Sequence, residues 1–262
     1  MEQLHTADEV QFRARTKSFV RRSRGLAQNL SRVLDQHGAT YLVPVARADS
    51  ATTIAPDTKI DWDQQFGRRA PLVVEVGSGN GEQIVAAAAA HPEQNYLSFE
   101  VWHPGVAKMI SRAASAGVTN LRIVEADAAQ ALPLLLGPDS VSEVWTFFPD
   151  PWRKKRHHKR RLVDGEFAGA VATILAPEGC WRLATDWDDY AWQMRDTIEA
   201  EPNLVNPHRG ARPDPLDPEP TRGGFAPRFP GRLLTRFEEK GLEAGRTVHD
   251  LTAIKPARKE QA

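Results

Sequence analysis

The chain has 262 residues, a single cysteine, and a formal net charge of zero from 34 basic and 34 acidic side chains. This length can bury a sizeable core in one α/β domain or in two small ones, and we expect one. Cys180 has no internal disulfide partner, and no apolar run approaches the ~20 residues of a membrane span. The first residues, MEQLH, lack the charged and apolar regions of a signal peptide. We therefore expect a cytoplasmic protein without membrane segments.

A basic arm precedes the main domain. Seven Lys and Arg side chains lie between residues 12 and 34, and no acidic residue lies between Glu9 and Asp35. The arm is predicted to contact phosphates, and its second half can form an amphipathic helix that rests on the domain. The apolar residues at helical spacing are Leu26, Leu30, Val33 and Leu34. We divide the chain into the arm (1–45), a linker (46–66), one domain (67–255) with a proline-rich loop (207–230), and a tail (256–262).

A glycine-rich loop follows the first predicted strand, residues 72–76. Gly77, Gly79 and Gly81 then open a predicted helix, and a strand, glycine loop and helix in this order bind nucleotides. The alternative is a sharp turn without a ligand. The glycine spacing differs from the G-x-G-x-x-G of dinucleotide enzymes, and Glu75 would repel a pyrophosphate. The loop therefore favours a cationic ligand such as S-adenosylmethionine over a dinucleotide.

The next two predicted strands also end in acids. Residues 96–100 end at Glu100, where a carboxylate can accept hydrogen bonds from both ribose hydroxyls. Residues 121–127 end at Asp127, which could reach an adenine amino group or could cap the helix that follows. The sequence leaves these two roles of Asp127 open. Between the strands, a helix is predicted to begin near Pro104 and to end at Gly117.

The stretch Phe147–Trp152 joins a central strand to a predicted site. Residues 144–148 are almost continuously apolar, as in a parallel strand that is covered on both faces. The two prolines that flank Asp150 remove amide donors and favour extended backbone at Phe148, so the strand ends there. Asp150 then lies at the carboxyl end of the strand, where open α/β sheets bind ligands, although an Asp between prolines is also common in turns. The nearby Trp152 favours a site for a flat, hydrogen-bonding ring such as a base.

Nine consecutive basic residues follow, from Arg153 to Arg161. No acid offsets them, so we interpret the run as a surface that contacts nucleic-acid phosphates rather than as a solvated loop. The net charge of zero does not oppose this interpretation, because local charge decides binding.

The remaining elements complete an alternating α/β pattern. Asp164 is predicted to cap a helix, and a strand over residues 180–185 ends in Asp186 and Trp187. Asp186 is either a second acid at the site or, like Asp188, only a cap for the next helix. A short helix to Gly241 and a β-rich segment over residues 247–254 close the chain.

Taken together, these motifs resemble the bacterial tRNA (guanine-N7)-methyltransferases. The resemblance covers roughly residues 15–255, and its most specific part is the Pro-Asp-Pro-Trp sequence with the basic run. The other parts, in matching order, are Glu75 with the glycine loop, Glu100, Thr185–Trp187 and Thr235–Glu238. The resemblance implies a doubly wound, Rossmann-like sheet of seven strands with the last antiparallel. It also implies S-adenosylmethionine as methyl donor, S-adenosylhomocysteine as product, no metal, and a guanine in the variable loop of tRNA as target.

The resemblance also implies roles for individual residues. The active-site carboxylate is Asp150. The donor is bound by Glu75, Gly77, Gly79, Gly81, Glu100 and Asp127. The substrate is bound by Lys154, Asp186, Thr235, Arg236, Phe237 and Glu238. RNA is contacted by Arg156, His157, His158, Lys159, Arg160 and Arg161.

Three alternatives stay open from the residues themselves. An adenine-N6 methyltransferase is suggested by a similar loop of the Asp-Pro-Pro-Tyr type, in which the order of residues differs. A dehydrogenase that uses NAD is disfavoured by the glycine spacing and by Glu75. A non-catalytic RNA-binding protein is disfavoured because Glu75, Glu100 and Asp150 are all present. The sequence does not decide between a monomer and a homodimer.

Overall fold

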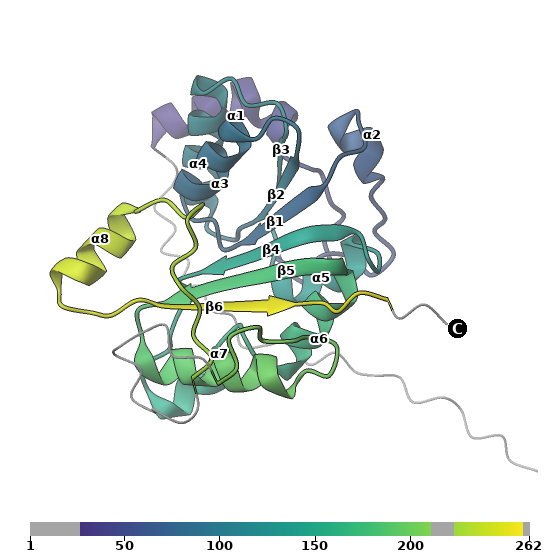
Figure 1. Cartoon of the computed structure of the whole chain (residues 1–262). Helices are drawn as coiled ribbons and strands as arrows, with labels where there is room; N and C mark the ends of the chain where they lie inside the picture. The colour runs from purple at the N-terminus through teal and green to yellow at the C-terminus, as the bar shows by residue number, and fades with distance from the viewer. Residues whose placement is uncertain (1–26, 211–222, 259–262) are drawn as a thin grey trace, which may run out of the picture.

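A single mixed sheet organises the protein. The computed structural model describes residues 27–210 and 223–258. The strands pair in the order β3-β2-β1-β4-β5-β6, and β6 runs antiparallel to β5 (Figure 1). Their bounds are β1 (Leu72–Val76), β2 (Asn95–Phe99), β3 (Leu121–Val124), β4 (Val141–Phe147), β5 (Leu175–Thr185) and β6 (His249–Ile254). The expected doubly wound, Rossmann-like sheet with an antiparallel last strand is confirmed.

The expected number of strands is wrong, because the sheet has six strands among the described residues instead of seven. Beyond β6, the edge carries isolated antiparallel bridges, Val205 with Ile254 and Ala226 with Asp250. Pro207 follows the first bridge closely and has no amide N–H to donate to a ladder, so regular pairing stops there.

Helices cover both faces of the sheet. α1, α3 and α4 pack together on one face, and α5, α6 and α7 on the other (Figure 1). Their bounds are α1 (Gln28–Tyr41), α2 (Trp62–Phe66), α3 (Glu82–Ala90), α4 (His103–Ser115), α5 (Ala128–Leu135), η1 (Lys155–Arg160, a 3-10 helix), α6 (Gly165–Ile174), α7 (Asp188–Ala200) and α8 (Arg236–Glu243). Within the described ranges, none of these helices combines the length and apolar character that crossing a bilayer requires.

Helix ends follow local sequence signals. Asp164 caps α6 as predicted, since its Oδ1 accepts a hydrogen bond from Phe167 N at 3.0 Å. Pro104 occupies the first turn of α4, and Gly117, with φ of 65°, lies just past its end. These boundaries depend on single residues, which is why the sequence predicts them well.

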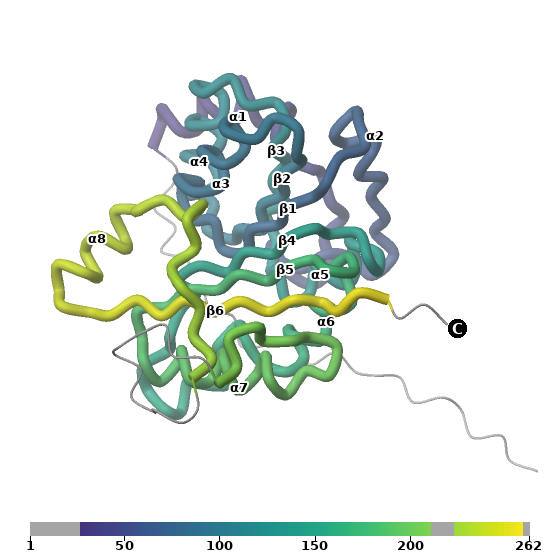
Figure 2. Tube along the Cα trace, in the orientation of Figure 1, coloured from purple at the N-terminus to yellow at the C-terminus, as the bar shows by residue number. Residues whose placement is uncertain are grey.

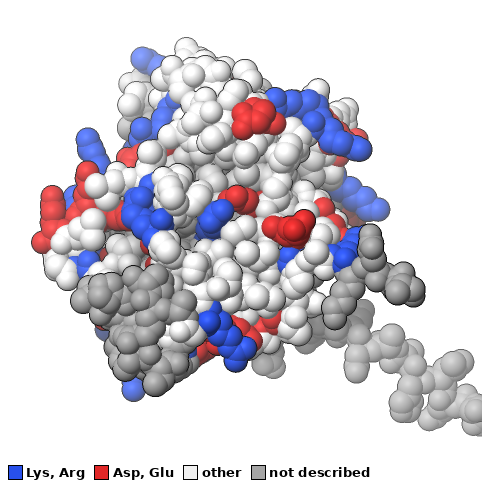
Figure 3. All heavy atoms as spheres, in the orientation of Figure 1, with Lys and Arg blue, Asp and Glu red and all other residues white. Residues whose placement is uncertain are grey.

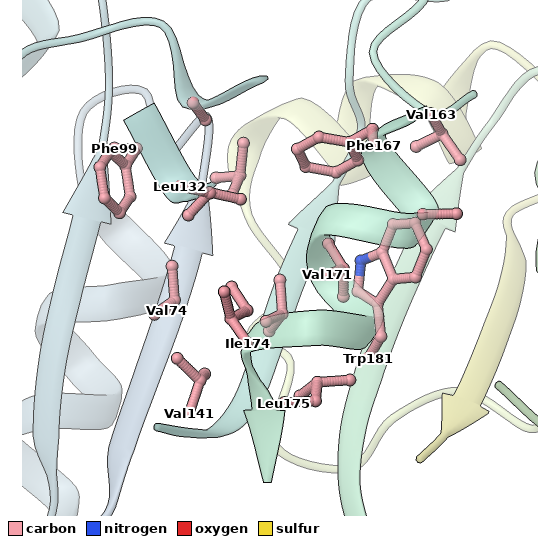
Figure 4. Close-up of a cluster of buried hydrophobic side chains, with 14 of the residues drawn as sticks. Val74, Phe99, Leu132, Val141, Val163, Phe167, Val171, Ile174, Leu175 and Trp181 are labelled. Carbon is pink, nitrogen blue, oxygen red and sulfur yellow. The ribbon is translucent and has the colours of Figure 1, made fainter. Parts of the chain in front are cut away.

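The hydrophobic core lies on both sides of the parallel strands. Every residue of β1 and β2 is buried, as expected for strands covered on both faces. Figure 4 shows part of the cluster against α5 and α6, with Phe167 beside Trp181. Their ring centroids are 5.7 Å apart, and the buried indole N–H of Trp181 donates to Thr146 Oγ1 at 3.1 Å. This core fixes β4 and β5, which carry the predicted site residues at their ends.

The segment before β1 packs against the sheet domain. Tyr41, at the end of α1, donates its hydroxyl hydrogen to Val118 O at 2.8 Å. Ile54 is fully buried, and the side chain of Gln130 bonds both its backbone N–H and its C=O, at 2.9 and 2.7 Å. Residues 46–66, predicted as a linker, therefore contribute to the packed domain. Residues 1–26, which include most of the basic arm and Leu26, lie outside the described residues.

Residues 223–234 cross the face of the sheet that α1, α3 and α4 leave open. They run over β6, β5 and β4 towards α3 and lead into α8 (Figure 2). Phe229 packs on Trp145 of β4, with centroids 5.8 Å apart, and the guanidinium of Arg182 in β5 lies 4.1 Å above the Phe229 ring. This crossing brings α8 to the carboxyl edge of the parallel strands.

Candidate active site

Two neighbouring cavities lie at the carboxyl edge of the parallel strands. The smaller, of about 230 Å³, is lined by Glu100, Asp127 and Asp150 among others. The larger, of about 640 Å³, is lined by Glu75, the glycine loop and the start of α8. Both share Gly77, Phe147 and Phe148 as lining residues. The structure thus brings the predicted donor residues and Asp150 to one edge, where such sheets bind ligands.

The glycines of the loop serve two physical purposes. Gly77, Gly79 and Gly81 all have positive φ, at 78°, 57° and 76°. A Cβ atom on Gly79 would meet nothing within 4 Å, so the backbone there faces open space that a ligand can approach. A Cβ atom on Gly81 would lie 2.3 Å from Met109 Cγ, so this glycine allows α3 to pack against α4.

Glu75 is a buried carboxylate with an unsatisfied oxygen. Its Oε2 has no hydrogen-bond partner in the structure, and the residue lines the larger cavity. Burial raises the pKa of Glu75 to about 7, with a hydrogen bond from Ser78 lowering it and the charge of Glu100 raising it. An orphaned carboxylate oxygen beside an open glycine loop fits the ammonium group of S-adenosylmethionine.

Glu100 braces the glycine loop from the end of β2. Its Oε1 accepts hydrogen bonds from the amides of Val101 and Trp102, both at 2.8 Å, and its Oε2 accepts one from Gly79 N at 2.6 Å. Burial raises the pKa of Glu100, while these amide bonds lower it and Asp150 raises it. The carboxylate is therefore oriented beside the loop. Oε1 already accepts two hydrogen bonds, so the lone pair that remains for a ribose hydroxyl is on Oε2.

Asp127 caps α5, which was one of the two predicted alternatives. Its Oδ1 accepts a hydrogen bond from Ala129 N at 3.1 Å. The residue also lines the smaller cavity, so its contact with an adenine remains a prediction.

Asp150 lies in a strained loop at the end of β4. The flanking residues Phe148 and Trp152 have φ of 52° and 43°, a left-handed conformation that is rare for large side chains. The expectation of extended backbone at Phe148 is therefore wrong. Phe148 N donates to Ala184 O of β5 at 2.8 Å, and its ring packs on Phe237 of α8 with centroids 5.3 Å apart. These tertiary contacts override the local preference before a proline, and Asp150 is left exposed.

Six of the nine residues of the basic run form η1, and two arginines of the run cover indole rings. The guanidinium of Arg160 lies 4.9 Å above the ring of Trp152, and that of Arg153 lies 4.7 Å above Trp187. The side chains of Arg156 and Lys159 are exposed. On the face in Figure 3, acidic and basic side chains are interspersed, in keeping with the zero net charge.

Desolvation and the neighbouring cations lower the pKa of His157, whose ring meets the Trp152 ring edge-on at 5.7 Å. Arg161 differs from the rest of the run, because its side chain is only 1% exposed and is paired with Asp189. Burial removes its guanidinium from the surface, which speaks against the predicted RNA contact of Arg161.

Asp186 follows β5 and is buried. Its Oδ2 lies 3.1 Å from Nε of Arg246 in an ion pair. Trp187 occupies the N-cap position of α7 without a side-chain hydrogen bond, so the alternative that Asp186 or Asp188 caps this helix is wrong. Asp188 instead lies 2.9 Å from Nε2 of the buried His249.

The segment Thr235–Glu238 forms the start of α8. Thr235 Oγ1 accepts a hydrogen bond from Glu238 N at 3.3 Å, and Phe237 is 54% exposed at the rim of the larger cavity. The buried carboxylate of Glu238 pairs with Arg228 at 3.2 Å and with Arg232 at 3.0 Å. In this arrangement Glu238 anchors α8 rather than facing the cavity.

Two residues that line the larger cavity, Gln83 and Arg232, were not predicted from the sequence as site residues. Gln83, in the first turn of α3, donates from Nε2 to Gly231 O at 2.9 Å and accepts at Oε1 from Leu233 N at 2.7 Å. Arg232, between those partners, is buried against Glu238 and Asp250 and lines the larger cavity. No local pattern marks Gln83, because its partners lie 148 and 150 residues further along the chain. Arg232 joins Glu238, 6 residues away, to Asp250, 18 residues away, and the sequence does not show that the two meet.

A Rossmann-like sheet, an acid ahead of an open glycine loop, and acids after the next two strands fit a methyltransferase that depends on S-adenosylmethionine. The family model described as "Putative methyltransferase" matches residues 69–251. A tRNA (guanine-N(7)-)-methyltransferase of Cutibacterium acnes is 47% identical over 235 residues, which cover 90% of this chain and 81% of the relative. One of Pseudomonas putida is 38% identical over 237 residues, 90% of each chain. The chain belongs to the tRNA (guanine-N7)-methyltransferase family.

Among solved structures, a 16S rRNA (adenine(1408)-N(1))-methyltransferase of Catenulisporales acidiphilia aligns with a TM-score of 0.49 and 16% identity. The alignment covers 83% of this chain and 99% of that one.

Proposed function

We propose that this protein transfers a methyl group from S-adenosylmethionine to N7 of a guanine in the variable loop of tRNA. The products are 7-methylguanosine in tRNA and S-adenosylhomocysteine. The observation that carries the proposal is the position of Asp150, between the cavity lined by Glu100 and Asp127 and the exposed basic run. We expect the protein to act in the cytoplasm, where it meets tRNA.

Four groups of this chain are proposed to hold the donor. The orphaned oxygen of Glu75 accepts from the ammonium group, and Oε2 of Glu100 accepts from a ribose hydroxyl. Asp127, which lines the smaller cavity, is proposed to accept from the adenine amino group, and the open backbone at Gly79 allows close approach. When bound, S-adenosylmethionine supplies an electrophilic methyl group on its sulfonium.

Guanine N7 has a lone pair and carries no proton, so its attack on the methyl carbon needs no general base. The N7–C bond forms as the S–C bond breaks, and the S–C electron pair returns to sulfur. Asp150 is proposed to accept hydrogen bonds from the guanine N1–H and amino group, and its charge stabilises the positive ring that results. Catalysis therefore depends mainly on positioning and on this electrostatic contact.

The nucleotide is proposed to enter the larger cavity from the side of α8 and to present its base where the two cavities meet at Phe147 and Phe148, since Glu75 and Gly79 of the larger cavity are assigned to the donor. Lys154 is exposed directly after the Asp150 loop, and Thr235, Arg236 and Phe237 line the cavity wall. Asp186 and Glu238 contribute through the ion pairs that fix this wall.

The test is incubation of the purified protein with unmodified tRNA and methyl-labelled S-adenosylmethionine, followed by nucleoside analysis. We expect the label in 7-methylguanosine. Label in N6-methyladenosine would indicate the adenine-N6 alternative. Absence of label, with donor binding intact by calorimetry, would indicate a binding protein.

The exposed cations of η1 are expected to bind tRNA phosphates. Arg156→Gln and Lys159→Gln should each weaken tRNA binding and lower the slope of log Kd against log salt by about 1. Arg69→Gln is the matched control, since Arg69 is an exposed cation just before β1, at the opposite edge of the sheet. Filter binding at salt concentrations from about 50 to about 200 mM measures the slope for each variant. Equal slopes for all three variants would contradict the assignment.

A further inference from the structure

The loop that carries Asp150 has few backbone N–H groups that could donate hydrogen bonds to the rest of the fold. Pro149 and Pro151 have no amide N–H, so the loop depends on carbonyl acceptors and side-chain contacts for its conformation. Phe148 and Trp152 both adopt the left-handed region, which persists only where the surroundings enforce it. Some part of the fold must therefore hold this loop from outside.

Arg161 makes that contact. Its Nε donates to Pro151 O at 2.8 Å, which ties the guanidinium to the residue directly after Asp150. Nη1 donates to Gln193 Oε1 at 2.7 Å, and Nη2 lies 2.5 Å from Asp189 Oδ2. The guanidinium thus joins the loop to α7 by three hydrogen bonds.

α7 packs against Arg161 and is hydrogen-bonded to the chain that follows it. Tyr190 is buried, and the guanidinium of Arg161 lies 4.8 Å from the centroid of its ring. The same helix also holds the chain just past Arg161, because Tyr190 Oη accepts from Val163 N and Gln193 Nε2 donates to Val163 O, both at 3.0 Å. Asp189, which carries the opposing charge, is 59% exposed, so the buried cation reaches its partner at the surface.

We propose that Arg161 is a positioning residue for the methyl transfer: it holds Pro151 O, and through it the carboxylate of Asp150, at the reacting base. This inference rests on the proposed function. It divides the basic run into an exposed part, which meets tRNA phosphates, and a buried last residue, which fixes the catalytic loop. Lysine is a poor substitute at this position, because a single ammonium group cannot reproduce the planar fork that serves the three acceptors.

The chain offers a matched control in Arg195 of α7. Its side chain is likewise 1% exposed, its Nη2 lies 2.5 Å from Oδ1 of the exposed Asp196, and its guanidinium lies 4.3 Å from the ring of Trp192. Its backbone acceptor is Gly223 O at 3.2 Å, which is not among the lining residues of either cavity. Arg195→Lys therefore makes the same substitution in a similar environment that, among the described residues, has no contact with the Asp150 loop.

The test compares Arg161→Lys, Asp189→Asn and Arg195→Lys with the unsubstituted protein. We expect Arg161→Lys to lower kcat about 10- to 100-fold, because small misplacements of catalytic groups have effects of this size. Asp189→Asn should lower kcat in the same direction. For both, the Kd for S-adenosylmethionine and the salt slope of tRNA binding should stay unchanged. Arg195→Lys should lower Tm comparably and leave kcat unchanged.

Hydrogen exchange gives a readout that does not depend on methyl transfer. Arg161→Lys should speed exchange in peptides over residues 147–153, whereas Arg195→Lys should speed it near residues 223–226. A weaker tRNA affinity and a smaller salt slope with unchanged kcat would make Arg161 an RNA contact and overturn the proposal. Equal losses of kcat in Arg161→Lys and Arg195→Lys would reduce its role to general stability. Failure of the unsubstituted protein to form 7-methylguanosine would refute the proposed function, and unchanged exchange over 147–153 would separately refute the support of the loop.

Discussion

Asp150→Ala lowers the turnover of tRNA methylation roughly 100- to 1000-fold, which is the range for removal of one electrostatic contact to a transition state. The physical reason is that the guanine ring becomes positive as its N7 gains the methyl group, and the carboxylate at its edge is then absent. The donor contacts at Glu75 and Glu100 are untouched, so the affinity for S-adenosylmethionine should change little. Single-turnover assays with saturating tRNA, together with calorimetric titration of the donor, measure the two quantities.

Asp164→Ala is a suitable comparison, because Asp164 lies on the other side of the basic run from Asp150 and caps α6. Loss of this cap should reduce stability by about 1 kcal/mol and leave the turnover of the folded protein unchanged. If Asp150→Ala retained full turnover, the assignment of the active-site carboxylate would be refuted.

Glu75→Gln should weaken S-adenosylmethionine binding about 10- to 100-fold at pH 7.5, since a hydrogen bond to a charged partner is lost. In the free protein, burial holds the pKa of Glu75 at about 7. The carboxyl is therefore mostly neutral at pH 6 and mostly ionised at pH 7.5. Because the ionised form attracts the cationic donor, the donor affinity of the unsubstituted protein should rise several-fold over this range. The rise should be absent in Glu75→Gln.

The same shift predicts an opposite effect on stability. The folded-state pKa of Glu75 lies above its ordinary value of 4.5, so the folded protein binds this proton more tightly than the unfolded chain does. Its contribution to stability is complete below pH 4.5 and is lost as the pH rises through about 7. Without donor at pH 7.5, Glu75→Gln should therefore melt at the same or a higher temperature than the unsubstituted protein.

Glu93→Gln provides the control for both measurements, because Glu93 is exposed and pairs with His91 away from the cavities. It should retain the pH dependence of donor binding. Identical pH profiles for Glu75→Gln and the unsubstituted protein would exclude Glu75 as the group that responds.

The elements that the sequence predicted well are those controlled by neighbouring residues. The glycine loop after β1 is one case, because Gly77, Gly79 and Gly81 permit a positive φ at the positions that need it. The end of β4 is another: it was predicted at Phe148 and lies at Phe147, because the prolines that follow cannot continue a strand. Asp150 reaches the carboxyl edge of the sheet for the same local reason.

Tertiary structure decided the partners of the charged residues. Within one basic run, Arg156 is exposed and Arg161 is buried, although the two have the same side chain, because the fold places Asp189 and Gln193 of α7 beside Arg161 and not beside Arg156. Asp186 is paired with Arg246, which lies 60 residues further along the chain, so it does not act as a helix cap.

The sequence by itself thus determined the order of strands and helices, the glycine loop and the carboxylates at the strand ends, since these depend on backbone preferences and hydrophobic patterns over a few residues. The tertiary structure alone decided the left-handed backbone at Phe148 and the hydrogen bonds of Gln83 to residues 231 and 233. Each of these depends on contacts between distant segments. A buried polar group forms hydrogen bonds with the partner that the fold brings within reach, and the neighbouring residues in the sequence do not predict which partner that is.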